Sequence, residues 1–215
     1  MIQPFHFYTR LNLVELLGMK AKNVMELLDG IKKAPGSSIY YHTHRFLQQH
    51  HYLSPEPPND FAFWTTNSLG LDELGERLAS ADTVRFRRIR DLRERFIEIL
   101  ESYTREKNVR IIDCQEGEEF HFMSCRTFIL PTCYKAHDLK EFIEILEKIS
   151  VNSLYFHIFE SRLRLERGEN DFSNWFEAMG MQELARELSR FDPYTITLEG
   201  LRRRIIQLVS KYVKN

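Results

Sequence analysis

Serine, histidine and aspartate occur twice in this chain in an order that could support nucleophilic catalysis. The two sets are Ser38, His42 and Asp60, and Ser153, His157 and Asp171. On a helix, a serine and a histidine four residues apart can touch, and an aspartate could orient the imidazole. A structural interpretation accounts for the same residues: the serine starts a helix, the aspartate lies at a helix N-terminus, and the histidine hydrogen-bonds near it. Because the sequence contains no Gly-x-Ser-x-Gly nucleophile elbow, we favour the structural interpretation.

Histidines and cysteines form two candidate metal sites. The first contains His42 and His44, with His50 and His51 further along the chain. None of these four stands three or four residues from another, as two ligands on one helix should. The second set offers the two nitrogens and two sulfurs that tetrahedral zinc prefers: His121, Cys125, Cys133 and His137. Its cysteines lack the Cys-x2-Cys spacing of a zinc knuckle, so we expect no bound metal and no other cofactor.

An arginine-rich run near the middle of the chain is the candidate for nucleic-acid binding. It extends from Arg85 to Arg95 and contains six arginines. Guanidinium groups bind phosphate well, but Asp91 and Glu94 interrupt the run, and the net charge of the chain is −1. Since a nucleic-acid-binding domain usually shows a basic excess, the run predicts a solvated, partly ion-paired helix face. Nucleic acid is therefore an unfavoured partner.

Three aromatic residues near these sets are candidates for contacting a ligand: Tyr41, Trp64 and Trp175. Their periodicity favours positions in the core, although a pocket between packed domains could also use them. The sequence contains neither of the common glycine-rich phosphate loops, Gly-x-x-x-x-Gly-Lys-Ser/Thr and Gly-x-Gly-x-x-Gly. Nucleotide chemistry is therefore unsupported.

These residues belong to an internal repeat. A shift of 115 positions aligns Phe5-His6-Phe7 with Phe120-His121-Phe122, and Tyr41-His42 with Phe156-His157. After a four-residue deletion, Asn59-Asp60-Phe61 meets Asn170-Asp171-Phe172, and the two tryptophans of the chain fall opposite each other. We interpret this as a tandem duplication: a first copy at 4–103, a charged linker at 104–118 and a second copy at 119–213.

The elements expected to position these residues are mainly helices. Asn23 and Asp138 each precede a glutamate by three residues, which predicts a capping box at the start of a helix. A further helix should begin at Asn59 or Asn170 and end near a glycine, and the last helix of each copy should be the longest. The alternation of 5–7 and of 120–122 would suit short strands, as in a small ribbon near the start of each copy. The predicted fold class is all-α, a helical bundle made of two repeats.

The motif string resembles that of a known group of proteins. It consists of Ser38-x-x-Tyr41-His42, then Asn59-Asp60-Phe61-x-x-Trp64, then Gly70-x-x-x-Leu74. With both copies included, the whole chain resembles a family of bacterial and archaeal proteins that contain a domain of unknown function. The resemblance supports the helical module and implies no activity.

The composition and the weak catalytic sets together favour a non-enzymatic interaction or regulatory module that binds a protein or a small molecule. The chain has no apolar stretch of about 20 residues, and its N-terminus lacks a secretory pattern, so we expect a cytoplasmic protein without a membrane partner. One alternative is a metal-dependent or hydrolytic enzyme that uses the first-copy histidines with Asp60. A second is nucleic-acid binding through the helix that contains Arg85–Arg95.

Overall fold

A computed structural model describes residues 3–45, 59–83, 86, 88–107, 112–161, 170–191 and 196–213. The elements of the first copy are β1 (Phe5–Ala21), α1 (Val24–Lys33), α2 (Gly36–Tyr40), the π-helical turn η1 (Tyr41–Arg45), α4 (Asp60–Asn67), α5 (Asp72–Ala79) and α6 (Ile89–Lys107). Those of the second are β2 (Phe120–Ala136), α7 (Leu139–Leu146), α8 (Val151–Tyr155), the π-helical turn η2 (Phe156–Glu160), α10 (Asp171–Ala178), α11 (Gln182–Ser189) and α12 (Leu198–Ser210). The same order of elements thus occurs twice.

The expectation of an all-α fold is wrong, because two 17-residue strands pair into an antiparallel sheet. The protein has a mixed α/β fold. Near their start the strands alternate buried and exposed residues, as at Phe5, His6 and Phe7, but burial in β1 then changes phase before Arg10. A β-bulge produces such a change of phase. The pattern therefore indicates a strand over only a few residues, which is why the sequence suggested a minor ribbon.

The chain forms two compact units. Their boundaries differ from those of the two sequence copies, because each strand is divided between the units. The second-copy unit joins β1 as far as Leu11 to the chain from Thr127 onward. The first-copy unit contains β1 from Asn12 onward, helices α1 to α6, and β2 as far as Arg126. The helices of each copy are therefore packed against the beginning of the other copy's strand.

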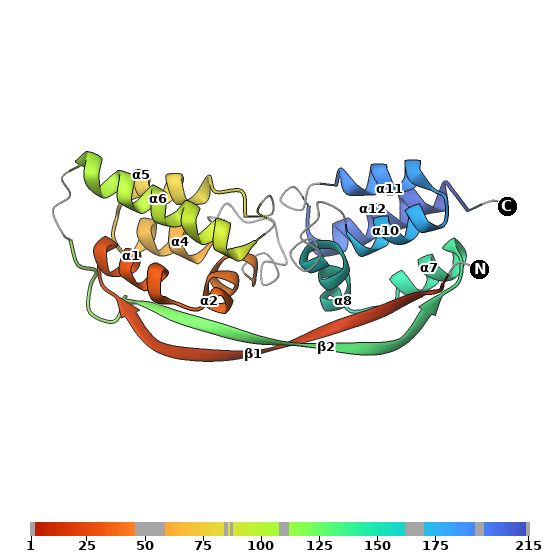
Figure 1. The fold of residues 1–215 in the computed structure, drawn as a ribbon, viewed down its shortest axis with the longest axis horizontal. Helices are drawn as coiled ribbons and strands as arrows, with labels where there is room; N and C mark the ends of the chain where they lie inside the picture. Colours follow the sequence, from red (N-terminus) through yellow and green to blue (C-terminus); the bar gives the residue numbers. More distant parts are fainter. Residues whose placement is uncertain are drawn as a thin grey trace. The chain divides into compact units, whose positions relative to one another are not determined.

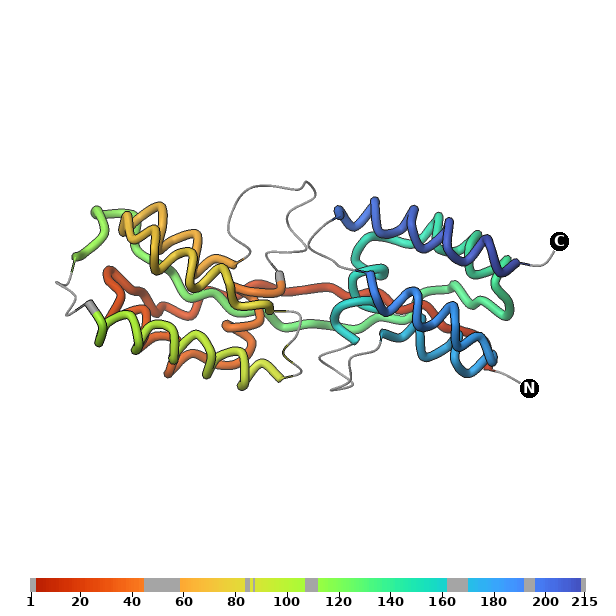
Figure 2. The backbone as a smooth tube through the Cα atoms, turned by 90° about the horizontal axis from the view of Figure 1, so that it is seen from above, coloured from red at the N-terminus to blue at the C-terminus, as the bar shows by residue number. Residues whose placement is uncertain are grey.

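Within each unit the helices lie on one side of the strands (Figure 1). Seen from above, α4 and α5 lie on one side of the strand path in the first-copy unit, and α6 lies on the other (Figure 2). The core of this unit includes Phe61 and Phe96 from the helices, together with Phe120 and Phe122 from β2. Gly30 of α1 faces the Phe122 ring so closely that a Cβ at this position would overlap it. A glycine is thus required where the strand crosses the helix.

The helix boundaries follow the capping residues predicted from the sequence. Asn23 and Asp138 accept hydrogen bonds from the backbone N–H groups three residues later, and Glu26 and Glu141 bind backbone N–H groups in return. Helices α4 and α10 end just before Gly70 and Gly180, whose φ values are 64° and 78°. Both capping boxes and both glycine stops are confirmed.

Helix α6 is the longest described helix of the first copy, and it extends to Lys107, beyond the expected end of that copy at 103. The segment that follows also contacts the first-copy unit. The Asn23 side chain donates to the Asp113 carboxylate at 2.7 Å, and the Cys114 N–H donates to the Lys22 carbonyl at 2.7 Å. Residues in the expected linker therefore help to fix the start of α1.

Candidate functional site

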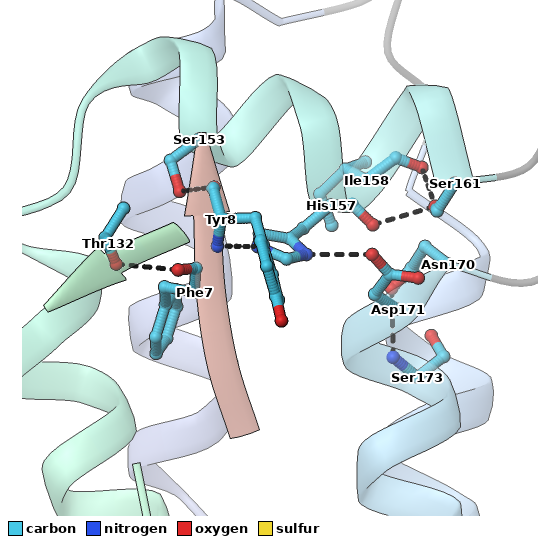
Figure 3. Close-up of polar contacts among 10 residues, drawn as sticks. All are labelled: Phe7, Tyr8, Thr132, Ser153, His157, Ile158, Ser161, Asn170, Asp171 and Ser173. Carbon is cyan, nitrogen blue, oxygen red and sulfur yellow. Dashed lines mark hydrogen bonds and ion pairs between the residues drawn. The ribbon is translucent and has the colours of Figure 1, made fainter. Parts of the chain in front are cut away.

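We call the beginning of each strand exchanged, because it packs on the helices of the other copy. His157 of the second copy binds the backbone of the exchanged strand β1 (Figure 3). The Tyr8 N–H donates to Nε2 of His157 at 2.9 Å, and Nδ1 of His157 lies 2.8 Å from Oδ2 of Asp171. Because Nε2 accepts a hydrogen bond, the ring proton must be on Nδ1, which donates to the carboxylate. The imidazole is therefore neutral and is held at both nitrogens.

Ser153 completes the contact with the same strand residue. Its hydroxyl donates to the Tyr8 carbonyl at 2.6 Å, so helix α8 and turn η2 together bind both backbone groups of Tyr8 (Figure 3). The neighbouring carbonyl, that of Phe7, accepts from the Thr132 hydroxyl of β2 at 2.7 Å. We call the set Ser153, His157 and Asp171 the second-copy clamp.

Asp171 reaches the histidine because of how α10 begins. Asn170 caps this helix by accepting from the Ser173 N–H at 2.9 Å, which makes Asp171 its first residue. A carboxylate in the first turn is also stabilised by the positive end of the helix. The adjacent Asn and Asp of the motif therefore have separate tasks: one caps the helix and the other orients the imidazole.

The first-copy clamp consists of His42 and Asp60, and it repeats the histidine contacts. The Met123 N–H donates to Nε2 of His42 at 2.9 Å, and Nδ1 of His42 lies 2.7 Å from Asp60. The prediction that each histidine bonds near the Asn-Asp turn of its own copy is confirmed. The serine differs, since Ser38 Oγ is buried and has no hydrogen-bond partner among the described residues.

The two motif tryptophans also bind backbone at the start of the exchanged strands. The Trp64 indole donates to the Glu118 carbonyl at 2.6 Å, and the Trp175 indole donates to the Gln3 carbonyl at 3.1 Å. Both rings are buried, as their periodicity predicted, and each packs on the first phenylalanine of the strand, Phe120 or Phe5. In each unit the tryptophan thus binds the backbone just before the strand, and the histidine binds the strand a few residues later.

Tyr41 is partly buried beside His42, with ring centroids 5.0 Å apart. In a hydrolase, an imidazole nitrogen would accept the proton of the serine. Here Nε2 already accepts from a strand N–H and Nδ1 already faces a carboxylate, in both His42 and His157. The arrangement serves to hold a strand, and it leaves no ring nitrogen to activate Ser38 or Ser153.

The structure places the candidate metal ligands in separate environments. His44 is buried with its ring stacked on Tyr40, His121 and Cys133 are exposed, and Cys125 is buried. Within the described part of the chain, no three His, Cys, Asp or Glu side chains gather as metal ligands would. His50 and His51 lie outside the described residues.

His137, the last of the candidate ligands, is exposed and lies 2.8 Å from Glu141 through Nδ1. The pKa of Glu141 is lowered below its ordinary value, first by the hydrogen bond from the His137 backbone N–H and then by the one from its ring. Both contacts belong to the capping box of α7, so His137 has a structural role at a helix start.

The arginine run lies mostly on α6, and several of its members are engaged. Arg90 pairs with Glu94 at 3.3 Å, and Arg95 pairs with Glu98 at 3.4 Å. Arg93 instead donates to the Ala34 carbonyl at 2.6 Å, just beyond the end of α1. Arg85 and Arg87 lie outside the described residues. The described part of the run therefore resembles the partly ion-paired face that the sequence predicted.

Sequence reasoning missed two features of the strands. The first is Arg10, whose side chain is fully buried and pairs with Glu160 at 2.8 Å. The second is a group of exposed apolar side chains near the middle of the strands. The sequence offered no clear signal for Arg10, because β1 also contains the charged residues Glu15 and Lys20, and the partner of Arg10 lies 150 residues away.

The comparisons with known proteins agree with this architecture. A family model described as a family of unknown function (DUF5752) matches residues 2–210. The solved structure of OrfY from Thermoproteus tenax is similar to this chain, with a TM-score of 0.80 and 27% identity over 97% of this chain and 94% of that chain. No curated protein matches the sequence. No helix of the described residues is long and apolar enough to cross a bilayer.

Proposed function

The chain belongs to this family of unknown function, and from that premise we propose that it is a non-enzymatic protein-interaction module. The proposed binding surface consists of Leu11, Phe128 and Leu130, which we call the apolar strand patch; Phe128 and Leu130 are two residues apart and therefore share one face of β2. These residues belong to the second-copy unit, and between 46% and 61% of each is exposed. Exposed clusters of large apolar side chains are typical of interaction sites.

The observation that carries this proposal is the contrast with the first-copy unit at two of these positions, Leu11 and Leu130; the third, Phe128, corresponds to the exposed Leu13. By the 115-residue shift, Leu11 and Leu130 correspond to Arg126 and Glu15. Those two residues form a solvent-exposed ion pair, with 3.8 Å between nitrogen and oxygen. The fold therefore accepts charged residues at these strand positions, and the apolar pair of the second-copy unit needs another explanation, which a bound partner would supply.

The size of the patch favours a short segment of another protein as its occupant. Three half-exposed side chains present on the order of 300 Å² of surface, whereas a standard stable interface buries roughly 800 Å² on each partner. A second copy of this chain would thus gain too little area for a stable dimer. An extended segment with alternating aliphatic or aromatic side chains fits the surface of a strand pair.

The proposed compartment is the cytoplasm, and the proposed origin of the chain is the tandem duplication. The three cysteines are free, as is usual for proteins in a reducing compartment. The recurrence of the element order and of the histidine clamps supports the duplication. The enzymatic and nucleic-acid alternatives have less support, because both ring nitrogens of His42 and of His157, and most of the described arginines of α6, already have protein partners.

The test replaces the apolar pair of the second-copy unit with the charged pair found at the equivalent positions of the first-copy unit. In Leu11→Arg/Leu130→Glu the second-copy unit receives the ion pair of the first-copy unit. A displayed library of random 12-residue peptides is selected on the wild-type protein alone, and the affinity of the selected peptides is then measured on the wild type and on this variant. We expect apolar, alternating consensus peptides that bind the wild type and bind the variant at least ~10-fold more weakly, a loss of about 1.4 kcal/mol.

The matched control is Arg126→Glu/Glu15→Arg, which reverses the ion pair at the equivalent positions of the other unit and should leave peptide affinity unchanged. Selected peptides that bind the patch variant as well as the wild type would overturn the proposal. Sedimentation of the wild type tests the choice of partner: a dimer that the patch variant abolishes would show that a second copy is the occupant.

A further inference from the structure

The buried ion pair of Arg10 and Glu160 lies where the exchanged strand meets the second-copy helices. Nη1 of Arg10 is 2.8 Å from Oε2 of Glu160, and the guanidinium lies over the Tyr155 ring, 4.4 Å from its centroid. The Arg10 side chain is fully buried, and the Glu160 side chain is 15% exposed. Strand β1 therefore enters its site with a charge that needs an acidic partner there.

The equivalent residues of the first-copy unit have a different charge pattern. The 115-residue shift places Cys125 opposite Arg10, and Arg45 opposite Glu160. Arg45 ends turn η1 as Glu160 ends turn η2, so the two positions are equivalent in the backbone as well. The strand docked in the first-copy unit thus has an uncharged residue type at this position, and the sequence has an arginine where the second copy has the receiving glutamate.

A second strand topology is compatible with an equivalent strand pairing. Phe7 lies beside Thr132 of β2, whose hydroxyl donates to the Phe7 carbonyl, and the first-copy residue that corresponds to Thr132 is Leu17, which keeps the position without that hydrogen bond. A strand that folded back between Phe7 and Leu17 would reproduce this antiparallel pairing as a hairpin within one copy. Since both copies begin with Phe-His-Phe, the hairpin would also offer the same aromatic residues to its own helices.

We propose that the Arg10–Glu160 pair selects the exchanged topology over the hairpin. In the hairpin topology Arg10 would enter the first-copy site, where the sequence has Arg45 at the position of Glu160, and Glu160 would face Cys125. Burying a charge without a counter-ion is strongly unfavourable. The pair thus decides which helices receive which strand, although the aromatic motifs of the two strands are the same.

Two engineered disulfides report the two topologies. Thr9 Oγ1 lies 3.4 Å from Ser150 Oγ, so Thr9→Cys/Ser150→Cys should crosslink the exchanged strand. Ser37 Oγ lies 2.7 Å from Ser124 Oγ, and Ser124 corresponds to Thr9. Thr9→Cys/Ser37→Cys should therefore crosslink only a hairpin. Fragment masses assign each disulfide, because the native Cys133 is exposed.

The decisive background is Arg45→Glu/Glu160→Arg, which moves the acidic partner of Arg10 to the first-copy site. We expect the yield of the 9–37 disulfide to rise at least ~10-fold over its level in the otherwise unchanged chain, and the yield of the 9–150 disulfide to fall.

Adding Arg10→Glu should restore the 9–150 disulfide, since the carboxylate introduced at position 10 would then meet the guanidinium introduced at position 160. The 9–150 disulfide persisting unchanged in the double-variant background would overturn the proposal. If that background fails to fold, the triple variant decides: folding with the 9–150 disulfide supports the proposal, and failure to fold overturns it.

Discussion

At the scale of single residues, the two histidine clamps each use one imidazole to accept a hydrogen bond from a strand N–H, that of Tyr8 or Met123. An unpaired, buried N–H costs about 1–3 kcal/mol, so the imidazole nitrogen that accepts from it has a direct energetic role. The aspartate fixes the tautomer of the imidazole, as the aspartate of a catalytic triad does, but here the imidazole binds a strand N–H. Serine, histidine and aspartate, the residue types of a catalytic triad, therefore have a structural role in this protein.

Replacing His157 by phenylalanine keeps the ring but removes both hydrogen bonds. We expect His157→Phe to lower the free energy of unfolding by about 3 kcal/mol, because the Tyr8 N–H and the Asp171 carboxylate lose their partner. Urea denaturation measures the change. The control is His6→Phe at an exposed strand position, which should stay within about 0.5 kcal/mol of the wild type. Equal stabilities of the two variants would contradict the clamp.

The two motif serines offer a matched pair. Ser153→Ala should cost about 1–2 kcal/mol, since the Tyr8 carbonyl loses its hydroxyl donor. Ser38→Ala should be neutral or stabilising within about 0.5 kcal/mol, because Ser38 Oγ is buried with no hydrogen-bond partner among the described residues. Thermal or urea unfolding of both variants checks the order. A larger loss for Ser38→Ala would show that this hydroxyl has a partner that the structure does not identify.

At the scale of elements, the helices follow from local rules, and their ends are fastened by contacts with other helices of the same copy. In the second copy, Arg202 at the start of α12 donates to the Leu146 and Ile149 carbonyls at the end of α7, as Arg93 does for α1. Near the other end of α12, the Tyr212 hydroxyl donates to Glu187 of α11 at 2.9 Å. The last helix of each copy thus holds the carbonyls left open by an earlier one.

The Tyr212 contact gives a prediction at high pH. Its hydrogen bond to Glu187 is the largest cause that raises the pKa of Tyr212 to about 12. A raised pKa means that the stabilisation is complete below the ordinary tyrosine value of about 10 and is lost as the pH rises through about 12. In a tyrosinate absorbance titration, Glu187→Gln should move one tyrosine of the nine to lower pH. A titration curve identical to that of the wild type would contradict this assignment.

At the scale of the whole molecule, each strand stabilises helices that are distant in sequence. Phe5 packs within 6.1 Å of the ring centroids of Phe142, Phe172 and Trp175, all of which belong to the second copy. Phe120 makes the equivalent contacts with Phe61 and Trp64 of the first copy. The stability of either helical unit therefore depends on a strand that the other copy encodes.

Phe5→Ala should consequently destabilise the second-copy unit. We expect a loss of about 3–5 kcal/mol, because a buried aromatic ring leaves a cavity among four others. Hydrogen exchange should show faster exchange of the amides in α7 and α10, with those in α1 and α4 unchanged. The control, Phe120→Ala, should give the reverse pattern. Loss of protection in α1 and α4 after Phe5→Ala would show instead that the strand stabilises its own copy.

The sequence by itself determined the helices, their caps and the contact between histidine and aspartate. These depend on residues that are close in the chain: Asn59 binds an N–H three residues away, and His42 meets Asp60 after 18 residues. Side-chain chemistry at such short range is constrained by helix geometry, so the spacing of residue types was sufficient. The same reasoning identified the clamp residues, but it did not predict that they bind a strand of the other copy.

Only the tertiary structure decided the fold class and the partner of each strand. The histidine contact with Tyr8 spans 149 residues, and both copies begin with the same Phe-His-Phe pattern, so periodicity cannot distinguish a strand docked on its own helices from an exchanged one. The difference depends on which buried groups meet across that distance. Arg10 finds a carboxylate in the second-copy unit, and the corresponding residue of its own copy is Arg45. Strand pairing is decided by such long-range contacts because local sequence pattern specifies the face of a strand and leaves its neighbour open.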